Sequence, residues 1–73
     1  MFVIEKKLSE QPAGAKGRFA QKLWVTREGV LDIYRRGNPS FTTMEKHTNA
    51  FNELFWTNYI YIDLFKKIPE DET

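Results

Sequence analysis

The sequence predicts a small α+β fold, in which a small antiparallel sheet packs against one α-helix. Three observations support this fold class. The first eight residues are rich in strand-forming side chains, residues 18–36 combine alternating side chains with a turn, and residues 42–56 carry apolar side chains at helical spacing. The sheet would consist of an N-terminal strand and a β-hairpin, with a C-terminal strand as a possible addition.

The N-terminal strand is predicted from the sequence MFVIEKKL. Phe2, Ile4 and Leu8 fall on one side of an alternating pattern, and Glu5 and Lys7 fall on the other. The following residues, SEQPAGAKG, contain one proline and two glycines. That composition is typical of a loop.

A β-hairpin is predicted over RFAQKLWVTREGVLDIYRR. A three-residue loop at 27–29 would place Gly29 in the left-handed bulge position, where glycine is preferred. The resulting register pairs the two strands so that their apolar side chains share one face. That face would contain Phe19, Leu23, Val25, Leu31 and Ile33.

A helix is predicted over residues 42–56, after a turn at GNPS. Thr42 and Glu45 have the spacing of a capping box at its start. Its apolar side would consist of Met44, His47, Phe51, Leu54 and Phe55. Because Trp56 points about a hundred degrees away from Phe55, one of these two rings should be exposed.

The segment NYIYIDLF has two interpretations. Ile60, Ile62 and Leu64 alternate as in a strand, whereas Phe55, Tyr59 and Ile62 extend the helical pattern. We predict a last strand after a break near residue 58. The whole chain is expected to form a single globular domain over 1–68, followed by a polar tail at 69–73.

Composition narrows the functional classes. The 73 residues include no cysteine, which excludes disulfides and thiolate metal sites and agrees with a cytoplasmic location. No apolar run approaches the roughly 20 residues of a membrane span, and the N-terminus lacks the apolar stretch of a secretory signal. A soluble protein is therefore expected, with a monomer as the simplest state.

Charge is distributed unevenly. Residues 1–37 carry eight Lys or Arg against four acids, and residues 38–73 carry three Lys against six acids, although the net charge is only +1. A basic face and an acidic end predict charged partners. The small total charge is not typical of a strong DNA-binding protein.

The predicted hairpin supplies the candidate binding residues, because its second face would combine basic and aromatic side chains. These candidates are Arg18, Lys22, Trp24, Tyr34 and Arg36. Lys22 would lie opposite Tyr34 across the strands. Such a surface is suited to partner proteins or to nucleic acid. In the alternative interpretation, other elements cover this face and Trp24 belongs to the core.

No catalytic residue, cofactor site or metal site is predicted. His47 is the only histidine and lies on the apolar side of the predicted helix, so a structural role is expected. The sequence contains no phosphate-binding loop or nucleophile motif. An enzyme is therefore the least expected class.

The whole chain, from MFVIEKKL through KLWVTREGVLDIYRRGNP to the acidic end, resembles a family of small phage proteins. These are transcription regulators that lytic phages direct against host RNA polymerase, such as the σ-displacing inhibitors and antiterminators of Xanthomonas phages. The resemblance implies a non-enzymatic protein that binds the large polymerase subunits in the host cytoplasm, inhibits σ-dependent initiation and promotes antitermination.

Two alternatives to polymerase binding stay open. The first is a small nucleic-acid-binding module that uses the basic and aromatic face, with steep salt dependence. The second is an inhibitor of another host enzyme. The sequence alone does not separate that inhibitor from a polymerase regulator.

Overall fold

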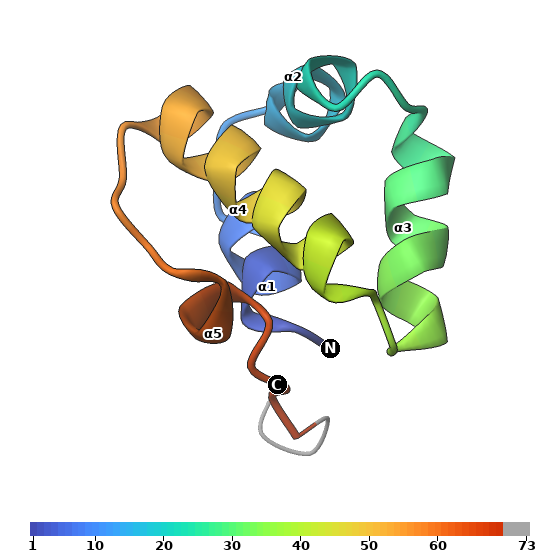
Figure 1. The fold of residues 1–73 in the computed structure, drawn as a ribbon. Coiled ribbons are helices and arrows are strands. Elements are labelled where there is room, and N and C mark those ends of the chain that lie inside the picture. Colours follow the sequence, from blue (N-terminus) through green and yellow to red (C-terminus); the bar gives the residue numbers. More distant parts are fainter. Residues whose placement is uncertain (70–73) are drawn as a thin grey trace.

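Five helices make up the regular structure of the computed structural model, which describes residues 1–69 (Figure 1). They are α1 (Val3–Ser9), α2 (Ala15–Lys22), α3 (Arg27–Arg36), α4 (Phe41–Phe55) and α5 (Tyr61–Leu64). Over these residues there is no strand, and a single isolated antiparallel bridge joins Phe2 and Lys67. The predicted α+β fold is therefore wrong, and the fold is all-helical. Most of the predicted polar tail, from residue 70 on, lies outside the described residues.

The predicted N-terminal strand is instead helix α1. Ile4 and Leu8, four residues apart, are both buried on its inner side. Phe2 precedes the helix in an extended conformation and is buried as well. The three side chains also fit the alternating pattern of a strand. The backbone is helical, and the four-residue spacing of Ile4 and Leu8 places both on the inner side of α1.

The predicted hairpin is also wrong. Residues 18–22 form the end of α2, residues 23–26 form a connection, and residues 27–36 form α3. The Oγ1 atom of Thr26 accepts a hydrogen bond from the Gly29 backbone N–H at 3.0 Å, which caps the start of α3. Gly29 therefore lies in the first helical turn. The left-handed residue of this region is Trp24, with φ of 61°. Gly37, with φ of 73°, ends α3.

The prediction of a helix over 42–56 is confirmed by α4. Its cap differs, since Ser40 Oγ accepts from the Thr43 N–H at 3.2 Å in place of the expected capping box at Thr42. The apolar side is as predicted, with His47 and Phe51 buried. Trp56 follows the helix in the left-handed region and is exposed.

The predicted C-terminal strand is replaced by a loop and the single turn of α5. Asn52 shapes this loop: its side-chain oxygen accepts from the Thr57 hydroxyl at 2.8 Å and the Tyr59 N–H at 2.9 Å. Its amide group donates to the Tyr59 carbonyl at 2.8 Å. Asp63 then accepts from the Ile60 N–H at 3.2 Å. These local bonds satisfy backbone groups that a strand would have paired with a neighbour.

The core collects side chains from all five helices around α4, which crosses the molecule with α1 behind it in Figure 1. Its largest fully buried side chains are Phe19, Phe51, Ile4, Leu64 and Thr48. The two ends of the described chain are joined, since the Val3 N–H donates to Lys66 at 2.9 Å and the Ile68 N–H donates to Met1 at 2.7 Å. Backbone hydrogen bonds thus hold the N-terminal residues against residues 66–68.

Candidate interaction surface

Three of the five predicted binding residues lie close together in sequence, on α2 and the connection that follows it. Arg18 and Lys22 are one turn apart on α2 and are both exposed. Lys22 Nζ also forms an ion pair at 3.0 Å with Glu53 of α4. Trp24 follows two residues later. Arg18 and Lys22 therefore lie on a helix and Trp24 lies on the connection that follows it, and none of the three is on a strand as predicted.

Trp24 is fully presented to solvent, with 94 % of its surface exposed. Its N–H donates to the Gln21 carbonyl at 3.0 Å, and the Val25 N–H donates to the Ala20 carbonyl at 3.1 Å. These bonds fix the connection between α2 and α3 while the ring points outward. The alternative in which Trp24 belongs to the core is wrong.

Tyr34 is not part of this surface, because it is buried with only 4 % exposure. Its hydroxyl oxygen lies 2.7 Å from His47 Nδ1, so it forms a hydrogen bond between α3 and α4. The predicted pairing of Tyr34 with Lys22 is wrong for a simple reason. In a helix, Tyr34 shares the inner side with Val30, four residues earlier.

The environment of Tyr34 and His47 keeps both side chains neutral near pH 7. Burial raises the pKa of Tyr34 above its ordinary value, and the negative charge of Glu5 adds to the effect. Burial lowers the pKa of His47 to about 4, with a further contribution from the positive charge of Lys46. A neutral hydroxyl and a neutral imidazole satisfy each other, which makes this pair structural.

Arg36 is exposed but lies away from Trp24, in the last turn of α3. Because α3 has ten residues, its first and last residues are separated along the helix axis by nine steps of about 1.5 Å, or about 13.5 Å. Its Nη2 atom forms an ion pair with Asp32 Oδ2 at 2.9 Å, one helical turn away. The structure therefore does not bring Arg36 together with the other predicted residues.

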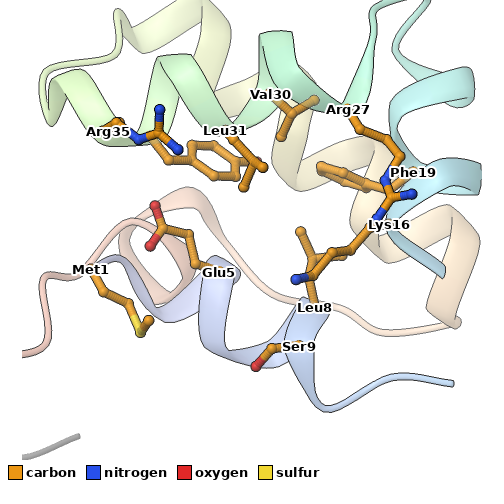
Figure 2. A pocket seen from close by; sticks show the side chains of 11 residues that line it. Met1, Glu5, Leu8, Ser9, Lys16, Phe19, Arg27, Val30, Leu31 and Arg35 are labelled. Atoms are coloured by element: carbon orange, nitrogen blue, oxygen red, sulfur yellow. The ribbon is translucent and has the colours of Figure 1, made fainter. Parts of the chain in front are cut away.

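A groove that sequence reasoning missed lies between α1 and α3 (Figure 2). Its volume is about 400 Å³. Apolar side chains form its floor, and four charged side chains border it, namely Glu5, Lys16, Arg27 and Arg35. Arg27, Leu31 and Arg35 are spaced four residues apart, a helical signal that the hairpin interpretation of the same residues concealed.

Residues 1–69 lack two other kinds of feature. This part of the chain holds no group of three or more His, Cys, Asp or Glu side chains placed to bind a metal ion. None of its helices has the length and apolar character needed to cross a membrane.

No protein-family model matches the chain, and neither a curated protein nor a solved structure matches it. Support for a function therefore comes from the chemistry of its surfaces.

Proposed function

We propose that this protein is a non-enzymatic transcription regulator that binds the large subunits of host RNA polymerase. It acts as a monomer in the host cytoplasm and interferes with σ-dependent initiation, with antitermination as a second effect. The observation that carries the proposal is the rigid presentation of Trp24 beside the basic helix α2. The proposal also relies on the resemblance of the chain to phage regulators of polymerase.

The chemistry around Trp24 favours a protein as the partner. Tryptophan is among the side chains that contribute most to protein interfaces when a partner covers them. Val25, the next residue, is 42 % exposed, so an apolar side chain adjoins Trp24 in the sequence. Glu28 and Asp32 place negative charge on the exposed side of α3, which is unfavourable against a phosphate backbone.

The net charge of α2 and α3 indicates which charge the proposed partner should carry. From α2 to the end of α3, residues 15–36 carry six Lys or Arg and two acids, for a local charge of +4. A positive surface speeds the encounter with an acidic surface and disfavours basic partners. An acidic region of a polymerase subunit would be complementary to it.

The test compares two tryptophans in the same backbone conformation. Trp24→Ala should weaken retention of purified core polymerase by about ten-fold or more, as expected for an anchoring aromatic side chain. Trp56→Ala is the matched control, because Trp56 is 93 % exposed and also has a positive φ. It should leave retention unchanged. The proposal fails if the wild-type protein neither retains core polymerase nor alters promoter-driven transcription.

A second candidate function is direct DNA binding, which the order of α2 and α3 favours. Helices joined by a short turn form the DNA-binding helix-turn-helix, whose second helix reads the major groove with its N-terminal residues. Here residues 23–26 separate α2 from α3, the two helices point in different directions, and Arg27 and Glu28 are exposed at the start of α3 (Figure 1).

Titration of duplex DNA would decide this candidate. If α3 binds DNA, anisotropy of a labelled duplex should rise on adding protein, and affinity should fall steeply with salt. Arg27→Ala should weaken that binding, while Lys66→Ala, at an exposed position after α5, should have little effect. No change in anisotropy at low salt would exclude it.

A further inference from the structure

We propose that the groove between α1 and α3 is a docking site for an acidic amphipathic segment of the partner protein. Apolar side chains of that segment would lie on the floor of the groove, and its carboxylates would pair with Lys16 and Arg27. This inference takes one point from the proposed function, namely that the partner is a protein. Of the residues that it uses, Arg27 also belongs to the helix-turn-helix alternative, whereas Lys16 and the floor of the groove belong to neither proposed function.

The groove exists because two helices that border it stand apart. The closely packed helix pairs include α1 with α2 and α2 with α3, but not α1 with α3. The space left between them has a volume of about 400 Å³. Cavities of roughly 300–1,000 Å³ are typical of binding sites.

The floor is suited to apolar side chains. Leu8, Phe19 and Val30 line it from three helices, and Tyr34 of α3 lines it as well. Two further apolar side chains, Met1 and Leu31, are 47 % and 42 % exposed at its borders. The floor side chains are already buried, so the apolar area that a partner would remove from water comes mainly from Met1 and Leu31.

The charged side chains at the border of the groove favour a partner of negative charge. Lys16 and Arg27 lie together at one end of the groove, and Arg35 faces Glu5 at the other (Figure 2). Within residues 1–69 the ion pairs are Lys22–Glu53 and Arg36–Asp32, so neither Lys16 nor Arg27 is neutralised by a carboxylate. Three cations against one carboxylate favour an acidic partner.

The combination of floor and border favours a peptide over a nucleic acid. A phosphate backbone would satisfy the two cations but has no apolar groups to cover Leu31 and the floor. An amphipathic peptide supplies both, because its apolar and acidic side chains lie on different sides of one segment. The predicted occupant therefore has Leu- or Phe-like side chains flanked by Asp or Glu.

A direct test uses a fluorescein-labelled peptide of about twelve residues, with leucines at helical spacing and glutamates elsewhere. The matched peptide replaces every glutamate with lysine. Saturable binding of the acidic peptide alone is expected. Arg27→Glu should weaken it by about ten-fold or more, because the substitution reverses a charge at the site. Leu31→Asp should weaken it as well.

Lys6→Glu provides the matched control. Lys6 is exposed on α1 and does not line the groove, yet its substitution changes the net charge by the same amount as Arg27→Glu. We expect it to change the affinity by less than about two-fold, as for an exposed charge outside the contact. Circular dichroism would verify that all variants keep their helices. Equal binding of the two peptides, or equal loss in Arg27→Glu and Lys6→Glu, would overturn the proposal.

The same variants tested on core polymerase separate the groove from the proposed function. If Arg27→Glu loses both the peptide and polymerase, the groove is supported as a docking site. If the acidic peptide binds as expected but the wild-type protein does not retain polymerase, the proposed function fails and the groove stands. If Arg27→Glu retains polymerase as well as the wild-type protein does, the groove proposal fails and the function stands.

Discussion

At Trp24 and Trp56 the backbone takes left-handed conformations, with φ of 61° and 59°, which bulky residues rarely adopt. Each residue follows a helix, at a position where glycine is the usual choice. Both rings are more than nine-tenths exposed, so neither conformation is stabilised by burying the side chain.

The conformation of Trp24 leads to a prediction about stability. Trp24→Gly should be more stable than Trp24→Ala by about 1 kcal/mol, because alanine keeps the left-handed strain and glycine removes it. Both variants lose the same exposed ring, so burial does not differ between them. Urea unfolding would measure the difference. An alanine variant as stable as the glycine variant would show that the backbone at 24 is not strained.

Thr48 is the other residue whose local chemistry is unusual. Its Oγ1 atom is buried and has no hydrogen-bond partner within the described chain. Thr48→Val keeps the shape of the side chain and removes that unsatisfied group, so the free energy of unfolding should rise by about 1 kcal/mol. Thr43→Val is the control, since its hydroxyl accepts from Ser40 Oγ at 2.9 Å and its loss should destabilise. A destabilised Thr48→Val would contradict the prediction.

At the scale of the elements, the sequence was sufficient for α4 and insufficient for α1, α2 and α3. The apolar spacing of α4 continues over fifteen residues, longer than almost any strand. In α1 and α3 the buried positions are few, and residues such as Phe2 and Ile4 also fit alternation. The left-handed position after α2 is occupied by Trp24 and not by a glycine, so the sequence carries no signal that a helix ends there. Gly29 was therefore interpreted as the turn residue of a hairpin.

The cap of α3 is the local signal that the hairpin interpretation overlooked, and it leads to a prediction. Thr26→Ala removes the acceptor for the Gly29 N–H, so it should destabilise the protein by about 1 kcal/mol. Thr26→Ser keeps an acceptor and should restore most of this loss. The measurement is urea unfolding followed by circular dichroism. If the alanine and serine variants were equally stable, the hydrogen bond at 26 would not hold the start of α3.

At the scale of the whole molecule, the prediction of strands in place of α2 and α3 determined which candidate binding residues were placed correctly. Arg18, Lys22 and Trp24 belong to one short segment, so they stay close whether that segment is a strand or a helix. Tyr34 and Arg36 are two residues apart and would share one face of a strand. In α3 they diverge, one into the core and one into solvent. The groove depends on tertiary packing and had no counterpart in the hairpin.

The buried pair of Tyr34 and His47 links the stability of the whole molecule to pH. The pKa of His47 is lowered to about 4 in the folded protein, against an ordinary value of 6.5. Below pH 6.5 the unfolded chain takes up a proton at this site while the folded protein does not, so acid favours unfolding. The stabilisation from His47 is complete above pH 6.5 and is lost as the pH falls towards 4. The loss is about 1.4 kcal/mol per pH unit, on the order of 3 kcal/mol in total.

Urea unfolding at pH 7 and pH 5 would measure this dependence. The wild-type protein should lose about 2 kcal/mol between these values, since pH 5 lies inside the window between the two pKa values. His47→Gln keeps a hydrogen-bonding side chain for Tyr34 and removes the titrating group, so its stability should change much less. The rings around His47, from Phe19, Tyr34 and Phe65, carry no charge that could stabilise an imidazolium. Equal pH dependence in the two proteins would therefore mean that His47 is protonated in the fold as readily as in the unfolded chain.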